Sequence, residues 1–135
     1  MYQRIFGPAD ETAWLAKWHT RMQAPHLVQL AFDGEQAVGF KVGYALDKDV
    51  FYSWLGGVLP EFRGRGIAQT LIEQQHRWCA QQGYRTIRTK TLNRWKSMLI
   101  LNLKNGFDII ETYTDNQGTR KIVLEKGLAG YWLAG

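Results

Sequence analysis

The chain has 135 residues, of which 45% are apolar and 21% are charged, with 17 Lys and Arg against 12 Asp and Glu. This composition is that of an ordinary soluble globular domain, and folding at this length buries roughly 70% of the surface that the unfolded chain exposes. We therefore expect one domain over residues 1–135, with a core that needs neither disulfides nor a structural metal. The longest apolar runs fall far short of the roughly 20 residues that cross a bilayer, which argues against a membrane span.

The cysteine content and the first residues bear on the location of the protein. Cys79 is the single cysteine, so no disulfide can form within the chain, and a reducing compartment is the expected environment. Residues 1–7 lack the apolar core of a signal peptide. Together these features predict a cytoplasmic protein with no membrane partner.

The formal net charge is +5 at pH 7 and the isoelectric point is near 9.5. Such a charge favours anionic partners, and a phosphate-bearing cofactor, a nucleic acid and an acidic protein would each satisfy it. Charge alone does not choose among the three.

The pattern of apolar residues predicts the first elements of the chain. Apolar residues at nearly helical spacing predict a helix over residues 8–22. Alternating apolar residues then predict two strands, 27–32 and 37–46, joined by a turn at Asp33 and Gly34. These strands form a β-hairpin.

A third strand and a long helix follow the hairpin. Residues 50–55 are β-branched and aromatic, and Gly56 and Gly57 interrupt them, which predicts a strand with a bulge near its end. An apolar stripe over residues 66–82 predicts an amphipathic helix, and Gly83 is placed to cap its C-terminus.

The remaining segments complete a mixed sheet. We expect a short strand over residues 85–91, a helix over 95–104, and a closing hairpin of strands 107–113 and 121–124. The fold class is therefore a single mixed α/β domain. Residues 127–135 show no clear period; docking on the body, docking on a second subunit and disorder all remain open for this tail.

The segment from Val58 to Ala68 carries the chemistry. It leaves a strand, passes through a loop with two glycines and enters the long helix. Glycines let the backbone approach a ligand closely, consecutive amides can hold an anion, and the helix N-terminus adds partial positive charge. The loop therefore has a phosphate-binding geometry that suits a pyrophosphate, although a tight turn with solvated arginines would have a similar sequence.

Two common nucleotide-binding loops do not fit this segment. It is too short for the loop that ends in Gly-Lys-Ser/Thr, and the dinucleotide fingerprint needs a third glycine and parallel strands on both sides. A single Gly64-Arg65-Gly66 between a strand and a helix also differs from a disordered Arg-Gly repeat that binds RNA.

Arg63, Gly66 and Ala68 match the acyl-CoA-binding motif of the GNAT family of N-acetyltransferases, and the whole run from Val58 to Ala68 resembles that motif. The later helix that closes with Gly106 and Phe107 resembles the second motif of the family. The resemblance implies a GNAT-like, mainly antiparallel sheet of about six or seven strands, flanked by helices, with a splayed central strand pair. It also implies acetyl-CoA as co-substrate and no metal.

The resemblance also assigns the cofactor-binding positions. Backbone amides of the loop would hold the CoA pyrophosphate, and the pantetheine arm would pair with the end of the third strand, which a bulge at Gly56 and Gly57 would splay from its neighbour. A backbone N–H of Val58 or Leu59 would polarise the acetyl carbonyl. The implied cofactor-binding residues are Val58, Leu59, Arg63, Gly64, Arg65, Gly66, Ile67, Ala68, Asn93 and Asn102.

The catalytic residues of the family are matched less completely in this sequence than its cofactor-binding motif. Asn102 occupies the position where the family often has a Tyr that protonates the departing thiolate, and an amide can only donate a hydrogen bond there. The general base is not identified, because both central strands lack a carboxylate; Glu61 and His26 are candidates, and a solvated loop residue is the alternative for each. His19 and His76 have no metal-ligand spacing.

The implied reaction is the direct attack of a primary amine on the thioester of acetyl-CoA, which makes the protein an N-acetyltransferase. The acceptor would be a small molecule or a peptide, and a homodimer is left open. A CoA-binding module without catalysis is the alternative, because Tyr and strand carboxylates are absent. A nucleic-acid binder has only the charge and the aromatic content in its favour, and we expect no nucleic-acid partner.

Overall fold

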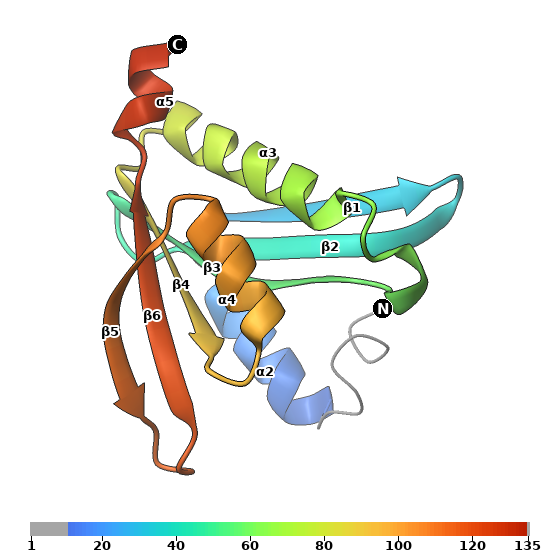
Figure 1. The fold of residues 1–135 in the computed structure, drawn as a ribbon, viewed down its shortest axis with the longest axis horizontal. Helices are drawn as coiled ribbons and strands as arrows, with labels where there is room; N and C mark the ends of the chain where they lie inside the picture. Colours follow the sequence, from blue (N-terminus) through green and yellow to red (C-terminus); the bar gives the residue numbers. More distant parts are fainter. Residues whose placement is uncertain (1–10, 135) are drawn as a thin grey trace.

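The computed structural model describes residues 11–134, with the side chains of residues 12–131, and shows a six-stranded sheet with helices on both faces (Figure 1). Among these residues no helix is long and apolar enough to span a bilayer. The elements in chain order are α2 (Glu11–Arg21), β1 (His26–Asp33), β2 (Gln36–Ala45), β3 (Val50–Val58), the 3-10 turn η1 (Pro60–Phe62), α3 (Ile67–Gln81), β4 (Thr86–Leu92), α4 (Lys96–Lys104), β5 (Asp108–Thr114), β6 (Arg120–Gly127) and α5 (Ala129–Ala134).

The sheet consists of two antiparallel halves that meet in one short parallel contact. Its strand order is β1-β2-β3-β4-β6-β5. Strands β3 and β4 pair in parallel over residues 50–53 and 86–89 only, because α3 connects them as a crossover on one face. Beyond this contact the two halves diverge (Figure 1). The predicted fold class, a mainly antiparallel sheet with a splayed central pair, is confirmed.

Successive residues of a strand face opposite sides of the sheet, and this alternation separates two layers of helices. Phe51 packs against Trp78 of α3, with ring centroids 5.6 Å apart. Its neighbour Tyr52 lies on the other side against Tyr44, whose hydroxyl accepts a hydrogen bond from Arg21 of α2. We call these sides the α3 face and the α2 face; α4 also lies on the α3 face (Figure 1).

The apolar core lies on the α3 face, at the end of the sheet where β3 and β4 still pair. Phe51 of β3, Ile87 of β4 and Leu124 of β6 are completely buried there, and Cys79 of α3 covers them. Burying each large apolar side chain stabilises the fold by about 1.5–3 kcal/mol. This cluster therefore holds the two halves of the sheet together.

Two predicted boundaries differ from the structure. Strand β3 continues through Gly56 and Gly57 to Val58, because both glycines pair in register with β2. The predicted first helix begins at residue 8, which lies outside the described residues; its described part, α2, ends at Arg21.

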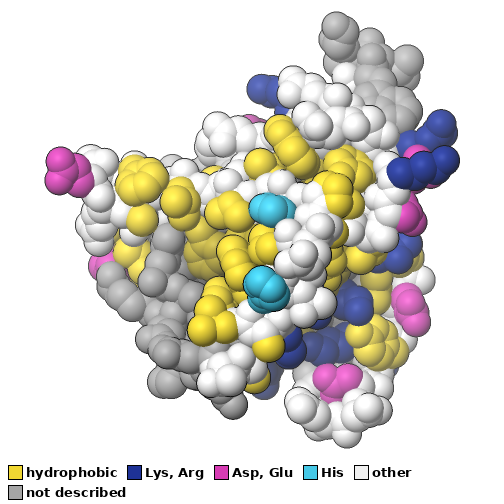
Figure 2. Space-filling view, turned by 180° about the vertical axis from the view of Figure 1, so that it is seen from behind, with side chains coloured by type: hydrophobic (Ala, Val, Ile, Leu, Met, Phe, Trp, Pro, Cys, Tyr) yellow, Lys and Arg dark blue, Asp and Glu magenta, His cyan; other side chains and the backbone are white. Residues whose placement is uncertain are grey.

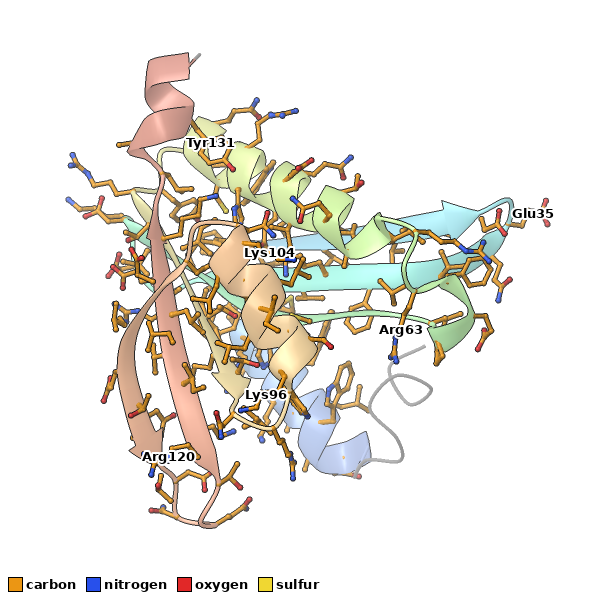
Figure 3. All side chains as sticks on the ribbon, viewed as in Figure 1. Glu35, Arg63, Lys96, Lys104, Arg120 and Tyr131 are labelled. Carbon is orange, nitrogen blue, oxygen red and sulfur yellow. The ribbon has the colours of Figure 1, made fainter. Side chains whose placement is uncertain are left out.

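The C-terminal tail docks on the body of the domain. Strand β6 runs to Gly127, and α5 follows. Leu128 between them is completely buried, and its backbone N–H donates to Arg85 O at 2.8 Å. Tyr131 lies beside the end of α3 (Figure 3), where its hydroxyl accepts a hydrogen bond from Lys126 Nζ at 3.2 Å. Of the three alternatives for this tail, the structure supports docking on the body.

Candidate functional site

A gap opens between β3 and β4 where their pairing ends. The Thr89 hydroxyl donates to Ser53 O at 2.9 Å and makes the last side-chain bridge of the paired segment. Beyond it, residues 54–58 of β3 have no partner on β4, and residues 90–92 of β4 pair only with β6. The gap therefore exposes one backbone edge of β3 to a ligand that can add to it as a strand would.

The bulge in β3 lies at Trp54, and the prediction of a bulge at Gly56 and Gly57 is wrong. Val42 pairs with Leu55 and Gly43 with Ser53, so Trp54 is the extra residue. An extra residue increases the local twist of a strand. The bulge comes directly after the last residue paired with β4, which is where the two strands diverge.

The hydrogen bonds to β2 determine which β3 groups face the gap. Leu59 N–H donates to Val38 O at 2.8 Å, so it cannot polarise an acetyl carbonyl, and this part of the prediction is wrong. Because backbone groups alternate along a strand, the amides of Val58 and Gly56 face away from β2 and towards the gap. Val58 thus keeps its predicted position, and Gly56 joins it as a residue that sequence analysis missed.

The loop before α3 leaves a row of amides unused. Gly64 and Gly66 have φ of 77° and 81°, a conformation that glycine adopts without strain, and Gly66 is the N-cap of α3. Among the described residues, no acceptor pairs with the amides of residues 64–69; the first helical bond is Thr70 N–H to Gly66 O. A Cβ on either glycine would meet nothing within 4 Å. This open row of donors lies at the positive end of the α3 dipole.

The two arginines of the loop bind the loop itself. Arg63 Nε donates to Val58 O at 3.0 Å, and Arg65 donates to Glu61 O at 3.3 Å while its guanidinium lies 4.8 Å from the Phe62 ring centroid. Figure 3 shows Arg63 beside the turn that precedes α3. Both side chains therefore fix the shape of the loop, and the predicted contact of their charges with phosphates stays a prediction.

Asn102 and Asn93 lie in different environments. Asn102 is buried on the side of α4 that also carries Leu99, and its side-chain amide makes no hydrogen bond within the described part of the chain. Asn93 is exposed in the turn before α4, where its side-chain oxygen accepts a hydrogen bond from Lys96 Nζ at 2.9 Å. The structure thus leaves Asn102 available to a ligand and gives Asn93 a partner of its own.

A model of the acetyltransferase (GNAT) family matches residues 1–95, which is more than half of the chain. The chain belongs to the GNAT family. The matched region includes the motif loop and ends before α4. The second motif, at Gly106 and Phe107, lies outside the match, and its assignment depends only on its position directly after α4.

Solved structures of other proteins share the fold of this chain. A GNAT acetyltransferase from Elizabethkingia anophelis with acetyl-CoA bound is 20% identical, with a TM-score of 0.72 over 87% of this chain and 83% of that one. The ribosomal-protein-S18-alanine N-acetyltransferase from Escherichia coli is 15% identical, with a TM-score of 0.77 over 93% and 82%. Ard1 from Thermoplasma volcanium is 17% identical, with a TM-score of 0.75 over 90% and 82%. A search of curated proteins gives no match.

Further polar groups without partners lie on the α3 face of this GNAT domain. Gln75 of α3 is completely buried and neither atom of its amide has a partner; the buried Thr91 hydroxyl of β4 is likewise unpaired. Burying a polar group without a hydrogen bond costs about 1–3 kcal/mol. Thr91 lies on β4 beyond its last pair with β3, so its hydroxyl suits a ligand in the gap that brings its own donors and acceptors.

Lys41 of β2 is a cation on the same face that sequence analysis missed. It pairs with Gly56, and a Cβ placed on Gly56 would lie 3.6 Å from Lys41 Nζ. Within the described residues its ammonium has no hydrogen bond or ion pair, and burial lowers the pKa of Lys41 to about 8. No signal in the sequence pointed to it, because a lysine within a strand is an ordinary residue; the space beside the flanking glycines, Gly39 and Gly43, is taken by Ile67 and Phe51.

The predicted base candidates lie outside the gap. Glu61 is exposed in η1, and exposed His26 has its Nδ1 3.0 Å from the acceptor Ala24 O. His76 is buried in α3, where its Nδ1 accepts from Lys126 Nζ at 3.1 Å; burial, aided by that ammonium, lowers the pKa of His76 to about 3. His76 is therefore neutral. Within residues 11–134 no group of His, Cys, Asp and Glu is arranged to hold a metal ion.

Aromatic side chains gather on the α2 face. Trp54 lies 6.1 Å from Trp18 and 5.8 Å from Tyr44, measured between ring centroids, and the Arg21 guanidinium lies 4.7 Å from the Trp54 ring. Burial raises the pKa of Tyr52 beside them to about 12, so its phenol stays protonated. Figure 2 shows hydrophobic side chains across the middle of the back of the molecule, which is the α2 side.

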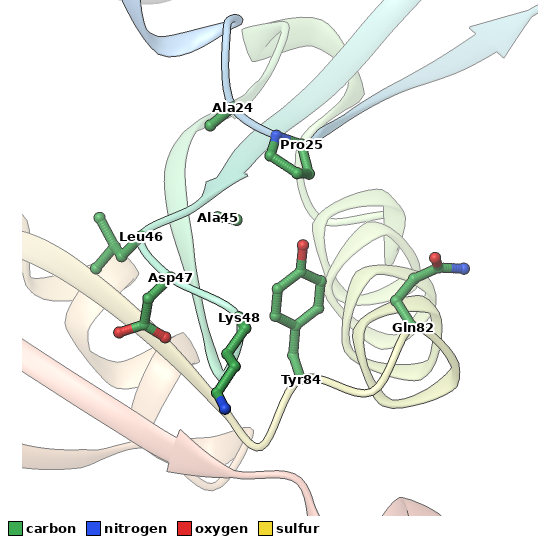
Figure 4. Close-up of a pocket in the computed structure, with 8 residues that line it drawn as sticks. All are labelled: Ala24, Pro25, Ala45, Leu46, Asp47, Lys48, Gln82 and Tyr84. Atoms are coloured by element: carbon green, nitrogen blue, oxygen red, sulfur yellow. The ribbon is translucent and has the colours of Figure 1, made fainter.

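Two hollows of the described surface lie away from the gap between β3 and β4. One of about 440 Å³ lies between Pro25, Leu46 and Tyr84, at the C-terminal end of α3 and far along that helix from the motif loop (Figure 4). Another of about 300 Å³ adjoins Gly66 and Ile67 and extends to β1. We assign the site to the gap because its free backbone edge and amides are chemically specific, whereas a hollow alone is not.

Proposed function

We propose that this GNAT domain transfers an acetyl group from acetyl-CoA to a primary amine by direct attack of the amine on the thioester. One arrangement carries the proposal: the free edge of β3 leads to a helix N-terminus whose first amides have no acceptor. A ligand that ends in a pyrophosphate and carries an amide-bearing arm matches both features. The E. anophelis GNAT structure was solved with acetyl-CoA bound.

The residues present suit this co-substrate. Amides 64–69 would hold the pyrophosphate, aided by the α3 dipole. Gap-facing backbone at Gly56 and Val58 would pair with the pantetheine arm, whose amides could also meet the unpaired groups of Thr91 and Asn102. Arg63 stays among the proposed cofactor-binding residues because its hydrogen bond to Val58 O fixes the shape of the loop.

Acetyl-CoA supplies the activated acetyl group when it is bound. Of the chain's own groups, a gap-facing N–H of Gly56 or Val58 would stabilise the negative charge that develops on the acetyl oxygen, which is usually the largest contribution in acyl transfer. Asn102 can donate a hydrogen bond to sulfur or to the arm but no acidic proton. No carboxylate lies on β3 or β4, so we propose that the acceptor reacts as the neutral amine present in bulk water.

The α2 face is the proposed approach of the acceptor. It carries Trp18, Tyr44 and Trp54 at the bulge, on the side of the sheet opposite α3. We propose a small-molecule or peptide amine as acceptor; the E. coli relative in fold is described as acting on an alanine of a ribosomal protein.

The alternative function is a CoA-binding module without catalysis. Asn102 at the position where the family often has a Tyr, together with strands that lack a carboxylate, favours this alternative. It predicts CoA binding without turnover of any amine.

Calorimetric titration with acetyl-CoA and with free CoA tests the proposal. Saturable binding of either, followed by thiol release in a panel of amines, supports the enzyme. Binding without thiol release across the panel supports the binding module. No binding of either molecule overturns both proposals and identifies the loop as an ordinary turn.

We further propose a cytoplasmic protein that binds neither nucleic acid nor membrane.

A homodimer is also proposed, since Val28, Leu30 and Phe32 are exposed on edge strand β1. Light scattering after size exclusion gives the oligomeric state, and a monomeric mass at all concentrations contradicts the homodimer.

A further inference from the structure

Lys41 is an uncompensated cation beside the free edge of β3. Its ammonium lies over Gly56, the residue whose backbone faces the gap, and it has no partner within the described residues. The pair Lys41 and Gly56 is of the non-hydrogen-bonded kind, in which facing side chains approach most closely. A ligand atom in the gap next to Gly56 would therefore lie near Lys41 Nζ.

The groups around Lys41 do not neutralise it. Cys79 faces it from α3, and burial raises the pKa of this thiol to about 12, so it carries no negative charge. His76, which is neutral, also interacts with Lys41 and accepts a hydrogen bond from Lys126. Gln29, the neighbour on β1, is uncharged. None of these neighbours is an anion. An anion that forms in the gap would therefore be the counterion of Lys41.

The departing sulfur is such an anion. If the pyrophosphate lies at the α3 N-terminus and the arm follows β3 through Val58, the thioester comes next to Gly56. Asn102 cannot supply the proton that sulfur needs. We propose that Lys41 protonates the departing CoA thiolate; this rests on the proposed function.

The proposed step balances as follows. The acceptor nitrogen forms a bond to the acetyl carbon, the carbon–sulfur bond breaks, and its electron pair goes to sulfur. A proton moves from Lys41 Nζ to that sulfur, which leaves a neutral Lys41 amine and CoA thiol. The acceptor nitrogen loses its proton to water, and water returns one to Lys41. A pKa near 8 suits this role, because the proton leaves readily and is regained near neutral pH.

Substitution of Lys41 tests the role by activity. Lys41→Met should lower kcat by at least about 100-fold, in the range of general acid catalysis, with KM for the acceptor unchanged. Wild type should lose activity above pH 8 as Lys41 deprotonates. Lys41→Arg keeps the cation but cannot release its proton, so it should lose kcat as Lys41→Met does; full activity of Lys41→Arg would overturn the assignment. The matched control is Lys104→Met, an exposed lysine of α4, which should leave kcat and the pH profile unchanged.

Binding supplies a second readout that does not depend on turnover. At pH 8, where about half of Lys41 still carries its proton, Lys41→Met should weaken the binding of CoA by at least about threefold while leaving desulfo-CoA, which has no thiol, unaffected. Equal loss for both ligands, an unchanged kcat, or an acetyl group found on Lys41 by peptide mass spectrometry would overturn the assignment. If wild type binds neither ligand, the proposed function itself fails, so the two failures are distinguishable.

Discussion

The two ends of the β3/β4 pair differ in strand pairing, in burial and in the hydrogen bonding of their polar groups. At the closed end, residues 50–53 and 86–89 are paired, and Phe51, Ile87 and Leu124 are completely buried. At the open end the strands diverge, and Lys41 and Thr91 have polar groups without partners within the described residues. The comparison indicates that the closed end supplies stability, whereas the open end keeps unsatisfied groups for a ligand.

The largest expected effect is the loss of an apolar side chain at the closed end. Phe51→Ala should lower the free energy of unfolding by about 3–5 kcal/mol, because the ring is completely buried between Trp78 and Tyr84. Urea denaturation followed by circular dichroism measures it. The matched change at the open end, Thr91→Val, removes an unpaired hydroxyl and should cost less than about 1 kcal/mol. A larger loss from Thr91→Val than from Phe51→Ala would invert the comparison.

The next effect is acid destabilisation through His76. Its folded pKa, about 3, lies below the unfolded value of about 6.5, so the unfolded chain binds the additional proton. The stability it contributes is complete above pH 6.5 and declines as pH falls towards 3, by up to about 1.4 kcal/mol per pH unit.

Urea titrations at a series of pH values measure this dependence. His76→Gln should flatten the slope between pH 6.5 and 4, whereas His19→Gln, at an exposed position of α2, should not. Identical slopes in wild type and His76→Gln would show that other groups govern acid unfolding.

A matched pair of glycines separates loop strain from ligand binding. Gly66 and Gly118 have φ of 81° and 79°, and a Cβ on either meets nothing within 4 Å. Alanine at each position should cost about 1–2 kcal/mol of stability through the left-handed conformation. Only Gly66→Ala should also weaken CoA binding, by about tenfold, because its methyl group lies among the free amides. Equal CoA affinity in the two variants would contradict the assignment of the loop.

The smallest expected effect lies on the surface of the closed end. Asp49 and Arg85 form an ion pair at 3.6 Å, with side chains 46% and 71% exposed. Asp49→Asn should change the free energy of unfolding by less than about 0.5 kcal/mol, because water and salt screen exposed pairs. A loss above 1 kcal/mol would mean that charge as well as apolar packing closes this end.

Much of the fold followed from local patterns. The two-residue and 3.6-residue periods predicted the strands and helices, and the glycine loop before α3 predicted the row of free amides. The errors arose where a residue's partner is remote. Gly56 and Gly57 indicated a bulge, yet they pair in register with β2, and Trp54 bulges instead.

The candidate site was predictable only in part for the same reason. The Val58 amide faces the gap, and its predicted contact with the cofactor stays a prediction, whereas the Leu59 amide is used by Val38 O. Lys41 and Gln75 escaped notice because a lysine in a strand and a glutamine in a helix are ordinary residues in sequence. Their lack of partners becomes visible only when β2, β3 and α3 pack together.

The sequence by itself determined the elements, the motif loop and the resemblance to the GNAT family, because periodicity, turn residues and a contiguous motif are encoded within short windows. Tertiary structure alone decided where β3 and β4 part, which backbone amides face the gap, and which polar groups are buried without partners. Those properties depend on residues far apart in the chain, such as Lys41, Gly56 and Cys79, whose burial and hydrogen bonding exist only once the strands and helices have packed.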